Sequence, residues 1–222
     1  MKTEAEIRLA GMRALIGALG LVEAERFLAA VSRDKFNYTE WRRTGLPDMI
    51  IDEIPIGNAP PWDINVIIEV PFGREPVKYE MDKKSGALYV DRVMHTSMRY
   101  PCNYGFVPHT LSEDGDPIDL LVASPVEFLS GSIVRSRPIG VLKMKDEKGA
   151  DEKVLAVPVD ALNPFYAGVE QYSDLPQILL NQISHFFRHY KDLDSGKWVE
   201  IEGWENAEHA AELITKAIER AP

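Results

Sequence analysis

Short runs of β-forming residues, separated by tight turns, dominate the chain from Ile64 to Val157. Gly, Pro and Asp recur between the runs, and these residues favour turns over regular strands or helices. The runs span residues 64–70, 77–81, 88–93, 118–122, 132–138, 140–144 and 154–157. Several short strands at regular spacing, with polar turns between them, indicate a barrel. The middle of the chain is therefore predicted to be mainly β.

Two helical patterns follow these strands. Asp174 is a candidate N-cap for a helix over residues 176–190, and Asn206 is a candidate N-cap for a helix over residues 207–220. In the second of these, apolar residues recur at helical spacing from Ala210 to Ile218. Two helices are thus predicted to flank the β domain.

Residues 1–48 differ in kind from the rest of the chain. Thr3 and Glu6 form a capping-box pattern, Gly20 can end the helix that follows, and apolar residues continue the helical spacing from Ala24 to Val31. Two short helices cannot bury a full core alone. This helical extension is therefore expected to dock on the β domain, on a neighbouring subunit or on a protein partner.

Three carboxylates, those of Asp114, Asp116 and Asp119, crowd into one hexapeptide whose Gly and Pro favour a turn. Such side chains can converge on one point, and hard oxygen ligands suit Mg²⁺ or Mn²⁺ better than zinc. An EF-hand is excluded, because Ile118 and Pro125 stand where that loop requires an Asp or Asn and a Glu. From the hexapeptide alone, a solvated acidic turn remains the alternative.

Carboxylates and cations recur elsewhere on the chain. Asp146 and Asp151 flank a Gly-containing turn, and Lys153 follows at once. Lys78 and Glu80 alternate on one predicted strand, so their side chains share a face. The remaining candidates are Glu69, Arg92, Tyr190 and Lys191. Carboxylates can hold cations, and Lys, Arg and Tyr can bind anionic oxygens, so this set indicates a site for a metal-bound phosphate.

Six blocks of the sequence carry a family likeness, namely residues 78–80, 82–88, 100–105, 114–119, 137–144 and 185–193. Together they resemble the soluble, magnesium-dependent inorganic pyrophosphatases of family I. The resemblance implies a five-stranded OB-like barrel with flanking helices over residues 49–222, and it leaves residues 1–48 as an appended extension. It also implies hydrolysis of pyrophosphate to two phosphates by a metal-activated water, with Mg²⁺ as the metal and Mn²⁺ as a substitute.

The resemblance further implies a role for each charged candidate. The residues expected to hold the Mg²⁺ ions are Asp114, Asp116, Asp119, Asp146 and Asp151. The residues expected to bind phosphoryl oxygens are Lys78, Arg92, Lys153, Tyr190 and Lys191. Asp116 is also the candidate general base, and Tyr104 would hydrogen-bond either the nucleophile side or Asp116. Glu69 would support the metals through water, and Glu80 would orient Lys78 through a salt bridge.

The composition of the chain excludes several classes of partner and of covalent link. The net charge of −10 argues against nucleic acid, because phosphate backbones require a basic surface. No apolar run approaches the roughly 18 residues of a membrane span, and the single cysteine, Cys102, excludes an internal disulfide. A cytoplasmic location is therefore expected. The resemblance implies a homohexamer, with His185 and His189 on a helix at a subunit interface.

Two other functions remain open from the sequence. OB-type barrels often bind oligonucleotides or sugars, and the extension could make the chain an interaction module on an inactive scaffold. A general phosphatase or nuclease would also use carboxylate-held metals, but it would act on phosphate esters. Phosphate release from pyrophosphate, compared with p-nitrophenyl phosphate, distinguishes these functions.

Overall fold

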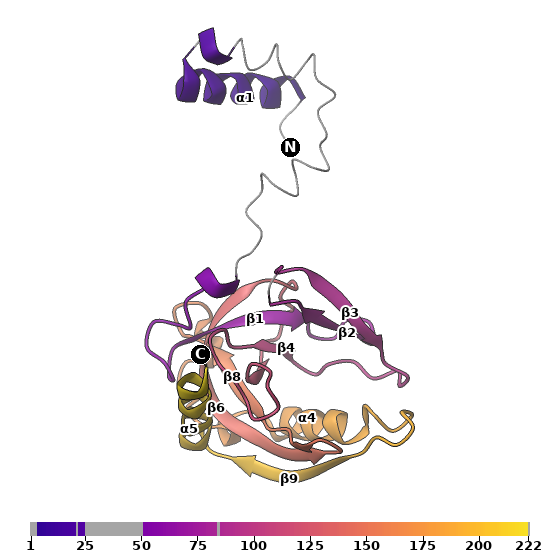
Figure 1. Cartoon of the computed structure of the whole chain (residues 1–222). Coiled ribbons are helices and arrows are strands. Elements are labelled where there is room, and N and C mark those ends of the chain that lie inside the picture. Colours follow the sequence, from indigo (N-terminus) through magenta and orange to yellow (C-terminus); the bar gives the residue numbers. More distant parts are fainter. Residues whose placement is uncertain (1–3, 21, 25–50, 84, 222) are drawn as a thin grey trace. The chain divides into compact units, whose positions relative to one another are not determined.

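The structure is a computed structural model that describes residues 4–20, 22–24, 51–83 and 85–221. The chain separates into two units, Met1–Asp48 and Met49–Pro222 (Figure 1). Within the described ranges, no helix combines the length and the apolar character that crossing a membrane requires.

The main element of the first unit is α1 (Glu4–Leu19). It ends, as predicted, before Gly20, whose φ of +80° is a left-handed conformation that glycine adopts without strain. The Gly20 N–H closes the last turn by donating to the Ile16 carbonyl oxygen at 2.9 Å. Helical backbone resumes over residues 22–24, at the start of the second predicted helix. The rest of that helix lies outside the described residues, as does Thr3 of the predicted capping box.

The second unit is mainly β, as predicted. Its strands are β1 (Ile64–Val70), β2 (Val77–Met81), β3 (Leu88–Val93), β4 (Asn103–Phe106), β5 (Asp119–Val122), β6 (Ile133–Asp146), β7 (Gly149–Ala150), β8 (Lys153–Pro158) and β9 (Val199–Glu205). Its helices are α4 (Gln177–His189), α5 (Ala207–Arg220) and short 3₁₀ turns η1 (Ile51–Glu53), η2 (Pro164–Tyr166) and η3 (Tyr172–Asp174).

Five strands close into a ring in the order β1-β4-β5-β8-β6, because β6 pairs back with β1. Neighbours in the ring are antiparallel except β5 and β8, which are parallel. β7 and β9 pair with β6 outside the ring, and β2 and β3 form a separate two-stranded sheet. The predicted five-stranded, OB-like arrangement is thus confirmed.

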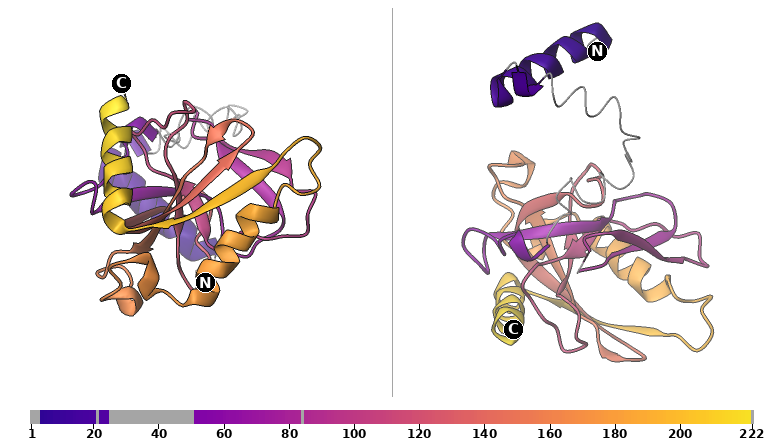
Figure 2. Two further views of the ribbon diagram at one scale, coloured as in Figure 1. Left: turned by 90° about the horizontal axis from the view of Figure 1, so that it is seen from below. Right: turned by 45° about the horizontal axis from the view of Figure 1, so that its top comes forward.

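The two faces of the ring carry different cores, since alternate residues of a strand point to opposite faces. On β8, Val154 joins one buried cluster and Leu155 joins the other. The cluster of Val154 includes Ile214 of α5, whereas the cluster of Leu155 includes Phe186 of α4. The two helices therefore cover different faces of the sheet and lie apart from each other (Figures 1 and 2).

Some strand boundaries differ from the prediction. A register shift between Pro138 and Gly140 allows one strand, β6, to continue where two separate runs are predicted. The sequence pattern does not predict β4 or β9 at all. β4 contains an Asn and a Gly, which resemble a turn, and β9 mixes charged residues with apolar ones.

The start of α4 corrects the predicted N-cap. α4 begins at Gln177, whereas Asp174 belongs to the preceding turn η3. The Asp174 carboxylate accepts hydrogen bonds from the backbone N–H of Gln171 at 2.9 Å and of Glu170 at 3.0 Å. Asp174 therefore stabilises the turn before the helix, because its side chain bonds towards the N-terminus.

α5 begins where the sequence predicts. The Asn206 side chain accepts a hydrogen bond from the His209 N–H at 2.9 Å, which satisfies one of the unpaired donors of the first turn. Along the helix, Ala210, Ile214 and Ala217 are buried at helical spacing. This buried stripe packs α5 against the ring.

Candidate active site

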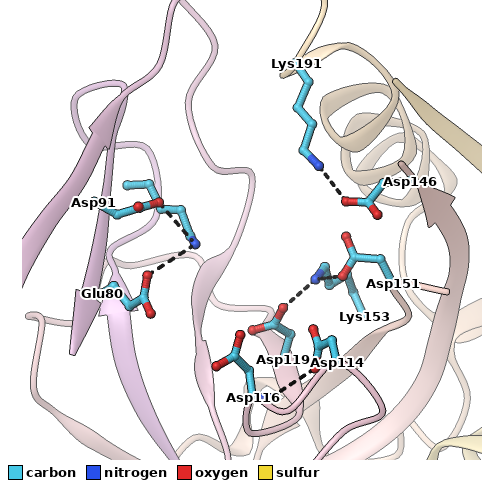
Figure 3. Close-up of polar contacts among 10 residues, drawn as sticks. Glu80, Asp91, Asp114, Asp116, Asp119, Asp146, Asp151, Lys153 and Lys191 are labelled. Carbon is cyan, nitrogen blue, oxygen red and sulfur yellow. Dashed lines mark hydrogen bonds and ion pairs between the residues drawn. The ribbon is translucent and has the colours of Figure 1, made fainter. Parts of the chain in front are cut away.

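Two adjoining cavities, of about 420 and 500 Å³, open where four segments meet. These segments are the β2–β3 hairpin, the loop before β5, the turn around β7 and the residues that end and follow α4. The residues shared by both cavities are Lys78, Arg92, Tyr104, Asp114, Asp116, Asp119, Lys148 and Lys197. Every candidate site residue from the sequence lines one or both cavities, and Figure 3 shows carboxylates and amino groups facing one another there.

The acidic hexapeptide forms a tight turn between β4 and β5. Gly115 has a φ of +92°, a left-handed conformation that would strain any side chain. The Ser112 N–H donates to the Asp116 carbonyl oxygen at 2.7 Å, and the Asp116 N–H donates to Asp114 Oδ1 at 3.1 Å. Asp114 and Asp116 are exposed, and Asp119 is the first residue of β5. The turn thus directs all three carboxylates towards the cavities (Figure 3).

Lys153 lies buried between two of the predicted metal ligands. Its Nζ donates to both Asp119 and Asp151 (Figure 3). Burial alone would lower the pKa of Lys153, but the charges of Asp119 and Asp151 outweigh it and raise this pKa. Burial alone would raise the pKa of Asp119, but the Lys153 charge and hydrogen bond outweigh it and lower this pKa. Lys153 and Asp119 are therefore both charged at neutral pH.

A second buried lysine pairs with a third predicted ligand. Lys191 Nζ lies 2.7 Å from Asp146 Oδ2 and 3.6 Å from Glu147 Oε2. The other Asp146 oxygen accepts from the Lys148 N–H at 2.8 Å. Burial opposes ionisation of Asp146, but the hydrogen bonds from Lys191 and Lys148 outweigh it and lower the Asp146 pKa. The ammonium group of Lys191 is thereby held at the cavity wall.

The β2–β3 hairpin supplies the opposite wall. Lys78 Nζ lies 3.3 Å from Asp91 Oδ2 and 3.9 Å from Glu80 Oε2, and Arg92 Nε lies 3.3 Å from the same Asp91 oxygen. The contact of Lys78 with Glu80 is predicted from the sequence, but the shorter contact of Lys78 with Asp91 is not. Lys78 and Arg92 are cross-strand partners, so Asp91, which precedes Arg92 on β3, also lies near Lys78. The register of the hairpin is therefore the signal that could have identified Asp91.

Two buried tyrosines line the first cavity. The Tyr104 hydroxyl interacts with Asp119 and thereby helps to lower the Asp119 pKa, whereas the resemblance implies a hydrogen bond to the nucleophile side or to Asp116. Burial raises the pKa of Tyr104, so its hydroxyl is protonated at neutral pH. Tyr100 also lines the cavity, with its ring centroid 5.1 Å from that of Tyr104, and the sequence reasoning gives it no role. Its place in the family block over residues 100–105 is the signal that could have identified it.

Glu69 lies on β1 at the edge of the second cavity. Its carboxylate accepts from the Met81 N–H at 2.8 Å and from Lys83 Nζ at 3.0 Å. Lys83 Nζ also stands 3.7 Å from the centre of the Phe106 ring. Burial raises the pKa of Glu69 by more than the Lys83 charge lowers it. Support of a metal through water remains a prediction for this residue.

The donor chemistry of the cavities fits a hard divalent cation. The lining of the first cavity includes five aspartate carboxylates, those of Asp114, Asp116, Asp119, Asp146 and Asp151. In the described part of the chain, no three His, Cys, Asp or Glu side chains lie close enough to share one ion. Mg²⁺ usually keeps several waters and binds only one or two carboxylates, so dispersed aspartates suit it.

The inorganic pyrophosphatase family model matches residues 66–222. The chain belongs to the inorganic pyrophosphatase family. An inorganic pyrophosphatase of Caulobacter vibrioides is 58% identical over 172 residues, which cover 78% of this chain and 97% of that relative. An Escherichia coli inorganic pyrophosphatase is 54% identical over 173 residues, which cover 78% and 98%. The solved structure of a Coxiella burnetii inorganic pyrophosphatase is 49% identical, covers 76% of this chain and 100% of that one, and has a TM-score of 0.74.

Membership of the pyrophosphatase family identifies the reaction. The enzyme hydrolyses inorganic pyrophosphate to two phosphates and depends on a metal ion. The resemblance carried by the six sequence blocks is thus confirmed. The matched range lies wholly within the second unit of the chain.

Proposed function

We propose that this pyrophosphatase uses Mg²⁺, with Mn²⁺ as a substitute, and that its aspartates hold the ions. The residues in this role are Asp114, Asp116, Asp119, Asp146 and Asp151. The observation that carries the proposal is the meeting of these acids with lysines and an arginine on the same cavities. When bound, Mg²⁺ lowers the pKa of a coordinated water and neutralises substrate charge.

Asp116 is the proposed general base. Asp119, Asp146 and Asp151 each bond a lysine, whereas no described residue forms an ion pair with the Asp116 carboxylate. It is also exposed to the cavities, where an attacking water must lie. A carboxylate that no lysine or arginine pairs with can accept the proton of that water as the new P–O bond forms.

The basic residues are proposed to bind the phosphoryl oxygens. Arg92 can contact two oxygens at once, and the lysines act as point charges. Burial raises the pKa of Tyr190, so its hydroxyl stays protonated and can donate to the leaving phosphate. The residues proposed for substrate binding are Lys78, Glu80, Arg92, Tyr104, Lys153, Tyr190 and Lys191, with Glu80 orienting Lys78.

Metal dependence and substrate choice test the proposal together. Phosphate release from pyrophosphate should require Mg²⁺, stop with EDTA, recover with Mn²⁺ and be poorly supported by Ca²⁺, whose larger radius and looser coordination suit the reaction less. p-Nitrophenyl phosphate should be a poor substrate. Full activity in metal-free buffer would contradict the metal mechanism, and equal turnover of both substrates would favour a general phosphatase.

Assembly and location are further proposals. We expect a homohexamer in which the exposed face of α4 lies at an interface. A largely apolar cavity there is lined by Met98, Ile178, His185 and Phe186, and Ile178 is 66% exposed. Residues 1–48 would bind a neighbouring subunit or a protein partner, while residues 49–222 would form the catalytic domain. The cytoplasm is the expected compartment.

A further inference from the structure

One buried side chain, that of Thr110, connects the two ends of the loop between β4 and β5. Thr110 is only 5% exposed. Its hydroxyl donates to the Val107 carbonyl oxygen at 2.6 Å and accepts from the Ile118 N–H at 3.0 Å. The Val107 N–H also donates to the Ile118 carbonyl oxygen at 3.2 Å. A single hydroxyl group therefore joins the strand that enters the loop to the strand that leaves it.

The residue before Thr110 adopts an uncommon backbone conformation. His109 has a φ of +56°, in the left-handed region that residues other than glycine rarely occupy. Its Nε2 lies 2.9 Å from the Ile54 carbonyl oxygen, which fixes the ring. Such conformations persist where the surroundings determine them, and they cluster at functional sites. The backbone at the loop entry is thus specified by tertiary contacts.

The outer side of the loop is attached to the end of α5. The Leu111 N–H donates to the Ala217 carbonyl oxygen at 2.8 Å, using an acceptor in the last turn that the helix itself leaves unpaired. Arg220 Nη1 donates to the Leu111 carbonyl oxygen at 2.9 Å, and Arg220 Nη2 lies 3.5 Å from Glu113 Oε1. These contacts lie immediately before Asp114.

We propose that Thr110, assisted by Arg220, is a positioning residue for pyrophosphate hydrolysis. Its hydroxyl determines how the two ends of the loop meet, and this determines where Asp114, Asp116 and Asp119 point. Neither Thr110 nor Arg220 is among the described residues that line the two catalytic cavities, so both act through the loop. The inference rests on the proposed role of these aspartates.

A matched pair of variants tests Thr110. Thr110→Val keeps the size of the side chain but removes both hydrogen bonds, whereas Thr110→Ser keeps the hydroxyl. Turnover of Thr110→Val should fall about tenfold to a hundredfold, because small misplacements of catalytic groups have effects of this size. Its Mg²⁺ affinity, measured by titration calorimetry without substrate, should fall severalfold. Thr110→Ser should stay close to wild type in both measurements.

A folded Thr110→Val enzyme with wild-type Mg²⁺ affinity and turnover would overturn the proposal, as would a Thr110→Ser enzyme that is equally impaired. If circular dichroism shows that Thr110→Val does not fold, Arg220→Gln decides, with Lys216→Gln as a control for lost charge on the same helix. Arg220→Gln should weaken Mg²⁺ binding more than Lys216→Gln does, and equal effects would again overturn the proposal.

Asp116→Asn separates this inference from the proposed function. If Asp116→Asn binds Mg²⁺ and turns over normally, the proposed role of the loop is wrong. If Asp116→Asn is impaired while Thr110→Val is normal, only the positioning role of Thr110 is wrong.

Discussion

Most charged residues of the active site are already paired. Lys153 and Lys191 bond aspartates that are proposed to hold metal, and the same lysines are proposed to bind phosphate. This pairing neutralises acids that would otherwise repel one another within one cavity. Asp114 and Asp116 differ, because neither carboxylate has an ion-pair partner among the described residues. Asp114 does accept a hydrogen bond from the Asp116 N–H, whereas the Asp116 carboxylate faces the cavities.

Asp116→Asn should therefore lower turnover strongly while changing the structure of the enzyme little. The substitution keeps the size of the side chain but removes a base and one anionic charge, so turnover should fall by at least about a hundredfold. Steady-state kinetics at saturating Mg²⁺ measures this loss, and circular dichroism should remain native. Asp160→Asn, the same change outside the cavities, should leave turnover unchanged. Near-normal turnover in Asp116→Asn would place the base elsewhere.

At the scale of elements, β1, β2 and β3 have the bounds that the sequence predicts, because apolar and β-branched runs end there at clear turn residues. β4 escapes prediction because Gly105 resembles a turn. In the fold, a Cβ at Gly105 would overlap the Ile67 carbonyl group, so glycine allows β4 to approach β1. This reason depends on a distant strand, which local pattern cannot reveal.

The same limit applies to the site. All candidate residues line the cavities. They could be predicted because carboxylates and cations recur along the sequence and the family resemblance implies a role for each. The sequence does not predict Asp91, Tyr100 or Thr110, because the role of each depends on a neighbour in the fold. These neighbours are Lys78 for Asp91, Tyr104 for Tyr100 and Ile118 for Thr110. Only the folded chain supplies those neighbours.

The turn before α4 gives a pH-dependent prediction. Hydrogen bonds from the Gln171 and Glu170 N–H groups lower the pKa of Asp174. Its stabilisation is thus present above the pKa of an unfolded aspartate, about 4, and is lost as the pH falls through the lower folded pKa. Asp174→Ala should lower the melting temperature at pH 7, and the difference from wild type should narrow below about pH 4.

Thermal melts at several pH values measure this effect. Asn206→Ala is the matched control, because Asn206 caps α5 with a neutral side chain and its contribution should not change in the same way. A constant difference between Asp174→Ala and wild type across the acidic range would contradict the prediction.

At the scale of the molecule, the chain has two units, and the family model matches residues of the second one. The family match, over residues 66–222, and all proposed site residues, from Glu69 onwards, lie in the second unit. The first unit carries exposed apolar side chains, among them Met12 and Leu19. Leaving such side chains in water costs roughly 1.5 to 3 kcal/mol each, so a covering surface is expected.

A chain that begins at Met49 should therefore fold and hydrolyse pyrophosphate within a few-fold of the intact protein. Light scattering should show a symmetric oligomer for the intact chain, and removal of residues 1–48 should change assembly or partner binding more than turnover. A monomeric intact chain at micromolar concentration would contradict the assembly. A folded, oligomeric truncated chain that has lost most turnover would show that the division at Met49 is wrong.

The closure of the ring has a consequence for how the enzyme matures. β1 pairs with β4 nearby in the chain and with β6 much farther along it, and pairings between distant segments form slowly. The acidic turn lies between β4 and β5, whereas Asp146 and Asp151 lie beyond, next to β7 and β8. In a chain in which only neighbouring strands have paired, the aspartates have therefore not yet come together in one site. We expect a newly synthesised chain to gain activity abruptly, when its last strands pair.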